Sequence, residues 1–170
     1  MKSVRIVSSI LFALTRILAW GYLTTTLYAT IVIVLKTSAF HLTEGGRFEI
    51  FYPFTARPFL LGYNNTVYVA EMLMAIGLYG VFFWLLSDVF KTFRQKKLFT
   101  PFGVASLSRF YIANLTVPLA VLIVLSIVSD EDNPMEIIVT LHAVIGIFAY
   151  FMAAIFRQGV SLQNEQDLYI

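Results

Sequence analysis

Apolar residues gather in four stretches along the chain, each about as long as one crossing of a bilayer. A helix needs roughly 20 mostly apolar residues to cross a hydrocarbon core of about 30 Å. The stretches of this length cover residues 17–35, 67–86, 110–128 and 137–156, and each holds at most one ionisable side chain. The pattern predicts an all-α integral membrane protein, a bundle of four transmembrane helices in a single membrane domain of residues 1–170.

Local signals indicate where several helices begin or end. Thr100 and Asn133 each precede a proline, so we expect them to be the N-caps of the helices that enter the third and fourth spans. Gly159 follows the fourth span, where a glycine commonly terminates a helix. The last helix is therefore expected to end near Gly159, with residues 157–170 as a tail.

The connection between the first two spans, residues 36–66, is too long for a plain turn. Gly45 and Gly46 separate two short stretches, which predicts a β-hairpin with a Gly-Gly turn. The residues expected to share one face of it are Phe48, Ile50, Tyr52 and Phe54. We interpret this aromatic face as a lid that packs over the helix ends or rests among lipid headgroups. A surface that binds a ligand or a partner is the alternative.

Lysine and arginine are shared unequally between the two sides of the predicted bundle. Nine of the twelve lie before the first span, in the connection of residues 87–109, or after the fourth span. The other three lie in residues 36–66, and the connection between spans three and four is acidic. The positive-inside rule then predicts that both termini and residues 87–109 are cytoplasmic, and that the hairpin is extracytoplasmic.

Composition excludes several other classes of protein. Hydrophobic residues make up 59% of the chain and charged residues 13%, whereas soluble domains average about 45–50% and about 25%. A soluble fold this apolar could not cover its surface with polar groups, so soluble enzymes and nucleic-acid-binding domains are excluded, and we expect no direct contact with nucleic acid. The chain has no cysteine, which rules out disulfides and thiolate chemistry.

Two ionisable residues fall inside the predicted spans. Glu71 lies about 6 Å below the outer edge of the second span and His142 about 7.5 Å below that of the fourth. Their similar depth makes them a candidate intramembrane polar pair, because such groups usually face the bundle interior and find partners. Three interpretations are open. The two residues form a structural hydrogen bond or ion pair between the second and fourth helices, they bind and release protons as part of the function, or they never meet. Asn114 in the third span is expected to hydrogen-bond to a neighbouring helix and so hold the two helices together.

The connection of residues 87–109 carries a basic patch interleaved with phenylalanines. Its members are Lys91, Arg94, Lys96 and Lys97. The patch could anchor the protein to anionic lipid headgroups, or it could dock a cytoplasmic protein partner. The sequence shows no phosphate-binding loop, catalytic carboxylate pair or metal-ligand spacing. We therefore expect no catalytic residues, no cofactor and no metal site, and predict that the protein is not an enzyme.

Two segments carry a family resemblance. "KKLFTPFGVASLSRF" opens the third helix and "IFRQGVSLQNEQDLYI" closes the chain. Together they resemble a domain-of-unknown-function family of small bacterial four-helix membrane proteins, the YoaS-like proteins. The resemblance implies a bacterial inner membrane and offers a small helix-turn-helix regulator as a possible cytoplasmic partner. It implies no activity.

These observations support two hypotheses of function. The first is a non-enzymatic multi-pass protein of the inner membrane that acts as a sensor or anchor through a cytoplasmic partner. The second is a small proton-linked transporter or channel that works as a homo-oligomer, in which Glu71 and His142 titrate.

Overall fold

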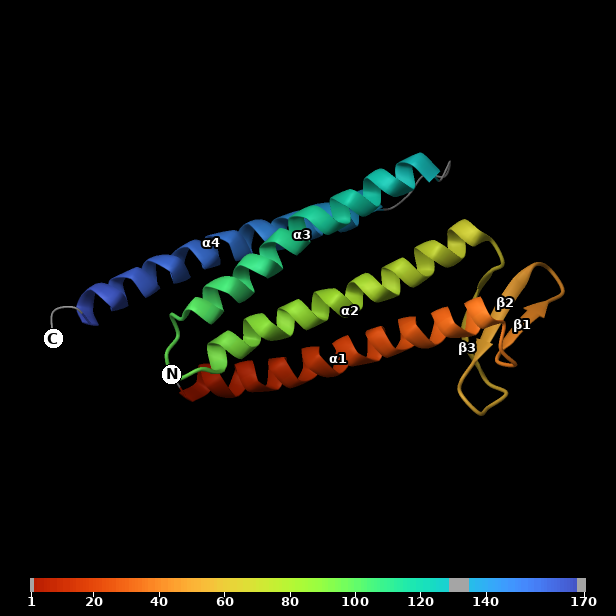
Figure 1. Cartoon of the computed structure of the whole chain (residues 1–170), viewed down its shortest axis with the longest axis horizontal. Helices are drawn as coiled ribbons and strands as arrows, with labels where there is room; N and C mark the ends of the chain where they lie inside the picture. Colours follow the sequence, from red (N-terminus) through yellow and green to blue (C-terminus); the bar gives the residue numbers. More distant parts are fainter. Residues whose placement is uncertain (1, 129–134, 168–170) are drawn as a thin grey trace. The chain divides into compact units, whose positions relative to one another are not determined.

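The computed structural model describes residues 2–128 and 135–167, and within these ranges the chain forms four helices and three strands (Figure 1). In chain order they are α1 (Lys2–Leu35), β1 (Phe40–Thr43), β2 (Arg47–Phe51), β3 (Pro58–Tyr63), α2 (Thr66–Arg94), α3 (Pro101–Val128) and α4 (Met135–Asp167). Each helix contains a stretch long and apolar enough to cross a membrane. The prediction of a four-span, all-α membrane protein with a small β element between its first two helices is confirmed.

The start of α3 follows the prediction. The hydroxyl of Thr100 accepts a hydrogen bond from the Gly103 N–H at 3.1 Å, and its carbonyl accepts one from the Val104 N–H at 3.1 Å. The first bond satisfies one of the N–H groups that the first turn of a helix leaves free, and the second is the first backbone bond of the helix itself. The corresponding prediction for Asn133 lies outside the described residues.

The predicted end of the last helix at Gly159 is wrong, because α4 continues to Asp167. The ring of Phe99 lies against Gly159 and leaves no room for a Cβ atom there. Because Gly159 has no side chain, Phe99 in the connection between α2 and α3 can pack closely against α4. Residues 157–167, predicted as a tail, are helical.

The chain divides into two compact units, described separately below. The helix unit comprises residues 1–17 and 82–170, and the sheet unit comprises residues 18–81. The helix unit holds the beginning of α1, the end of α2, and α3 and α4. We call the end of this unit where α1 begins and α2 ends its terminal end.

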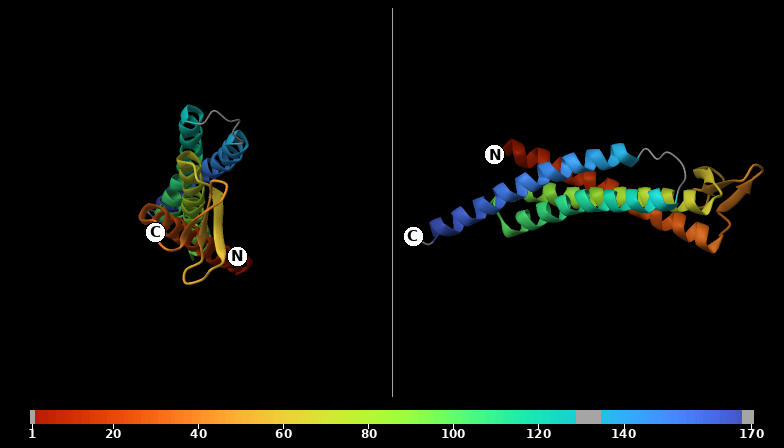
Figure 2. Two further views of the ribbon diagram at one scale, coloured as in Figure 1. Left: turned by 90° about the vertical axis from the view of Figure 1, so that its right-hand side faces the viewer. Right: turned by 90° about the horizontal axis from the view of Figure 1, so that it is seen from above.

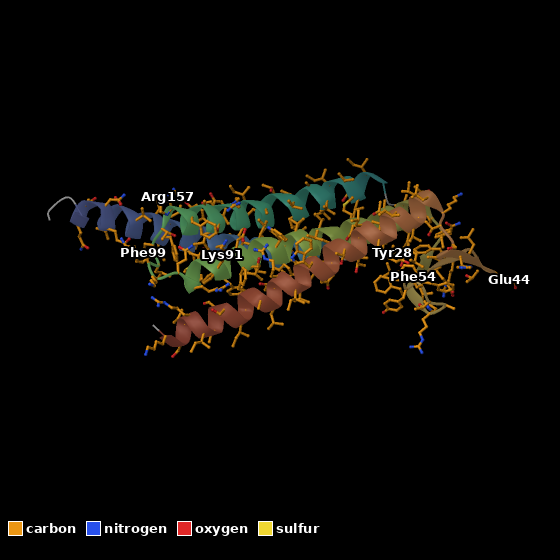
Figure 3. The ribbon with its side chains drawn as sticks, turned by 60° about the horizontal axis from the view of Figure 1, so that its bottom comes forward. Tyr28, Glu44, Phe54, Lys91, Phe99 and Arg157 are labelled. Atoms are coloured by element: carbon orange, nitrogen blue, oxygen red, sulfur yellow. The ribbon has the colours of Figure 1, made fainter. Side chains whose placement is uncertain are left out.

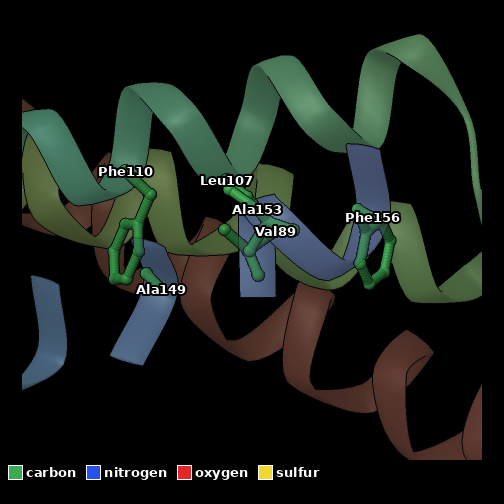
Figure 4. Close-up of a cluster of buried hydrophobic side chains, with 6 residues drawn as sticks. All are labelled: Val89, Leu107, Phe110, Ala149, Ala153 and Phe156. Carbon is green, nitrogen blue, oxygen red and sulfur yellow. The ribbon is translucent and has the colours of Figure 1, made fainter. Parts of the chain in front are cut away.

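The core of the helix unit lies between α2, α3 and α4 (Figure 4). Its buried members are Val89, Leu107, Phe110, Ala149, Ala153 and Phe156. A stripe of small residues on α4 faces α3: Ala149 and Ala153 are buried, and a Cβ added to Gly146 would come within 2.8 Å of Leu115. Small side chains let two helices approach closely, and this packing drives helix association in lipid, where water exclusion does not.

The sheet unit is built on the end of α1 and the beginning of α2, where β1, β2 and β3 pair in that order, all antiparallel (Figures 1 and 2). The predicted glycine turn is present, with Gly45 and Gly46 at φ values of 119° and 72°. Such positive angles suit glycine because it lacks a Cβ. The third strand was not predicted, so the expected hairpin is two strands of a three-stranded sheet.

The buried face of the sheet rests on the helices of its unit. Phe48 and Ile50 have no exposed surface and pack with Ala29 and Val32 of α1. The predicted aromatic face is therefore confirmed at its first two positions. It is wrong for Tyr52 and Phe54, which are exposed because β2 ends at Phe51 and the chain turns away. The interpretation of the sheet as a lid stays a prediction.

Candidate functional site

A hydrogen bond between two polar side chains joins α3 to α4 inside their apolar stretches. Asn114 is 4% exposed, and its amide nitrogen donates to the Phe110 carbonyl at 2.8 Å. The amide oxygen is then free to accept, and it lies 2.7 Å from His142 Nδ1, so this ring nitrogen carries the proton. The ring of Phe82 on α2 meets the imidazole edge-on, with centroids 5.3 Å apart. Asn114 and His142 thus form an interhelical polar contact within the helix unit.

Glu71 lies in the sheet unit, whereas His142 lies in the helix unit. The pairing of Glu71 with His142 therefore stays a prediction. Within the part of the chain that the structure describes, the Oε1 atom of Glu71 is buried and has no hydrogen-bond partner. A buried polar atom without a partner is uncommon in native proteins, and inside a membrane span it points to function.

An ion pair that sequence analysis missed connects α1 with α2 within the helix unit. Arg16 Nη2 lies 2.8 Å from Asp88 Oδ1, and the two side chains are 20% and 16% exposed. The Arg16 guanidinium also lies 4.0 Å from the ring centroid of Trp84. A signal was present, since Arg16 directly precedes the first apolar stretch and Asp88 follows the second by two residues. The two charges are opposite and fall at the same side of two consecutive spans, which favours an ion pair between them.

The basic patch of Lys91, Arg94, Lys96 and Lys97 lies at the terminal end of the helix unit. Two of its members rest on aromatic rings: Lys91 Nζ is 5.2 Å from the ring centroid of Phe102, and the Arg94 guanidinium is 4.5 Å from that of Phe12. The Lys96 carbonyl accepts a hydrogen bond from Arg5 at 3.3 Å. These contacts position the stems of the side chains, while Lys96 and Lys97 are exposed to solvent.

Phenylalanine packing fixes the connection between α2 and α3 against α4. Phe156 on α4 is 2% exposed and meets Phe93 and Phe99 edge-on, at centroid distances of 5.6 and 5.3 Å. Phe99 also covers Gly159 one turn further along α4. Figure 3 shows Phe99, Lys91 and Arg157 gathered at this end of the helix unit. We call this packed end, residues 91–102 with 156–167, the terminal platform.

The polar contacts and the terminal platform described above offer charged groups and hydrogen-bond donors and acceptors. Among the described residues, no group of three or more His, Asp or Glu side chains is placed to hold a metal ion. The terminal platform offers exposed ammonium and guanidinium groups, which attract phosphates and carboxylates. The structure thus brings together Asn114 with His142, and the four basic residues, which are neighbours in sequence, lie at the terminal platform.

Comparison with known proteins identifies a family. No curated protein and no solved structure matches the chain. The model of a family described as "Protein of unknown function (DUF2975)" matches residues 49–170, which include α2, α3 and α4. This match confirms the resemblance to a domain-of-unknown-function family, and the description assigns no activity. The chain belongs to the DUF2975 family.

Proposed function

We propose that this chain is a non-enzymatic multi-pass protein of the inner membrane that acts as an anchor or sensor, and that its terminal platform binds a cytoplasmic protein partner. The observation that carries the proposal is the packing of Phe99 on Gly159 and Phe156. It attaches the basic connection to the extended α4, so that a partner meets a folded surface.

The distribution of charge supports a cytoplasmic position for this platform. Nine of the twelve basic residues lie on the side of the predicted bundle that carries the chain termini. The positive-inside rule places that side in the cytoplasm. Anionic lipid headgroups would attract the same residues, so the partner surface has to extend beyond the headgroup zone.

The extension of α4 provides that reach. Eleven residues from Arg157 to Asp167 continue the helix, which is about 16 Å at 1.5 Å per residue. Most of these residues are polar and exposed, including Gln158 and Glu165. The partner that the family resemblance offers is a small helix-turn-helix regulator, which would place its acidic residues against the basic connection.

Co-purification with matched charge variants tests this function. One variant changes Lys91, Arg94, Lys96 and Lys97 to Gln, and the control changes Lys36 and Arg47 to Gln in the sheet unit. We expect a protein to co-purify with the native chain and with the control from mild detergent, and to be lost from the first variant. Repeated recovery of the native chain alone, or equal recovery of a partner with both variants, would contradict the proposal.

A proton-linked transporter or channel that works as a homo-oligomer is the second candidate, favoured by the buried, unpartnered Oε1 atom of Glu71. Proteoliposomes that contain a pH-sensitive dye measure proton flux directly. This candidate predicts a flux that Glu71→Gln abolishes and the control Glu49→Gln leaves unchanged. Flux that is equal in both variants, or absent from the native chain, would exclude it.

A further inference from the structure

The loop between β2 and β3 presents a large aromatic side chain in an unusual way. Phe54 is fully exposed, at 107% of its reference surface, and adopts a φ of 60°. A residue other than glycine rarely adopts this left-handed conformation. The tyrosine at position 52 is also 47% exposed. We call residues 52–57 the aromatic loop.

Hydrogen bonds within the aromatic loop hold its shape. The Tyr52 N–H donates to the Arg57 carbonyl at 3.0 Å, and the Thr55 N–H donates to the Tyr52 carbonyl at 3.1 Å. The Arg57 N–H donates to the Thr55 hydroxyl at 3.3 Å. Irregular backbone tolerates a water-poor environment only when its polar groups are satisfied in this way.

The aromatic loop starts beside α1, below the outer end of that helix. The Tyr28 hydroxyl donates to the Phe51 carbonyl at 2.6 Å, and the ring of Phe59 contacts the rings of Tyr28 and Tyr52 at centroid distances of 6.4 and 4.5 Å. Tyr28 comes eight residues before Lys36, the first charged residue after the apolar stretch of α1. Eight helical residues span about 12 Å, so this anchor lies beside the span.

The labelled side chains show the same relation in space. In Figure 3, Phe54 lies at the level of Tyr28 along the sheet unit, while Glu44 in the β1–β2 turn lies at the far tip of the sheet. The β1–β2 turn therefore extends beyond the end of α1, whereas the aromatic loop lies beside α1.

We propose that the aromatic loop inserts Phe54 into the boundary between headgroups and acyl chains of the lipid leaflet on the sheet side. The occupant of this surface is phospholipid. Aromatic side chains concentrate at this boundary in membrane proteins, and insertion removes the exposed ring from water. The exposed Arg57 guanidinium at the end of the loop is placed to pair with a lipid phosphate. The loop thus sets the depth of the sheet against the membrane.

Spin labelling tests this inference, because the native chain has no cysteine and any introduced one is unique. The variants are Phe54→Cys and, as the control, Glu44→Cys, each carrying a nitroxide in phosphatidylcholine and phosphatidylglycerol vesicles. Collisions with oxygen report lipid, and collisions with a water-soluble nickel chelate report water. We expect the label at position 54 to favour oxygen and the label at position 44 to favour nickel, with ratios that differ severalfold.

Equal access of the nickel chelate to both labels would overturn the proposal. So would a label at position 54 that is water-exposed in vesicles and becomes shielded only when a membrane extract supplies a protein. A second pair of variants tests the native ring: Thr55→Cys with Phe54 kept, and Thr55→Cys with Phe54→Asp. We expect the label to move towards water only in the second, and an identical depth in both would also overturn the proposal.

Discussion

The guanidinium of Arg16 on α1 and the carboxylate of Asp88 on α2 form an ion pair at 2.8 Å, with the ring of Trp84 beside the guanidinium. An unpaired charge next to lipid has a high free-energy cost, and the ion pair lowers that cost for both residues. The pair lies at the border of the apolar stretches and ties the first helix to the second within the helix unit.

Removal of either member of this pair leaves the other without its partner. We expect Arg16→Ala and Asp88→Ala each to destabilise the protein, and the double variant to lose far less than the sum. A double-mutant cycle of unfolding in mild detergent should give a coupling of about 1.5–3 kcal/mol, the usual range for a hydrogen bond to a charged group. Additive effects of the two substitutions would show that the pair contributes no coupling.

Close helix approach at glycine gives a second prediction. A Cβ atom at Gly103 would lie 2.6 Å from Thr92 Cγ2, and one at Gly146 would lie 2.8 Å from Leu115. Overpacking of this kind costs about 1–3 kcal/mol, so both alanine variants should lower the thermal midpoint in detergent. Gly21 is the matched control, because nothing lies within 4 Å of an added Cβ. Its alanine variant should be unchanged or more stable by up to about 1 kcal/mol. Equal thermal midpoints for the three alanine variants would contradict the close packing at Gly103 and Gly146.

Much of the fold was predictable because the membrane makes the hydrophobic pattern simple. A span needs a continuous apolar stretch, and helix caps such as Thr100 are local signals. The end of α4 was mispredicted because Gly159 has two possible uses in a helix. One is local, at a C-terminus, and the other is to admit a neighbouring group such as Phe99. Sequence alone does not separate them, since the second depends on a residue sixty positions away.

The contact between Asn114 and His142 gives a third prediction. Asn114→Leu removes the amide oxygen that accepts from the imidazole Nδ1–H. Interhelical hydrogen bonds in membranes are worth about 0.6 kcal/mol on average and up to about 1.7, so the loss should fall in this range. Thr116→Val is the control, because the Thr116 hydroxyl bonds only to its own helix at the Ile112 carbonyl in the described structure. The contact is refuted if the control loses as much stability as Asn114→Leu in unfolding titrations.

The buried core of the sheet unit gives a fourth prediction. Phe48 is fully buried, and its truncation to alanine should cost about 3–5 kcal/mol, as in other cores. Limited proteolysis should then cut the region of residues 36–65 faster, while the helix unit keeps its resistance. Leu42→Ala is the control, since Leu42 is 61% exposed. A cleavage rate that Phe48→Ala leaves unchanged would show that the sheet is not held by this contact.

The candidate sites were less predictable than the fold. Depth in the membrane suggested a partner for His142, but depth alone leaves the choice of neighbouring helix open, and the structure places Asn114 against it. The third strand was missed because residues 58–63 begin with proline and carry consecutive apolar side chains instead of an alternating pattern. Their pairing depends on β2, a long-range partner that local periodicity does not reveal.

Side-specific labelling of single cysteines tests the central claim, which is four membrane crossings with both chain termini in the cytoplasm. Glu44→Cys marks the sheet and Gln166→Cys marks the end of α4; both native residues are exposed. A membrane-impermeant maleimide should modify position 44 in intact spheroplasts and position 166 only after lysis. Modification of position 166 in intact spheroplasts, or no modification of position 44 there, would contradict the account.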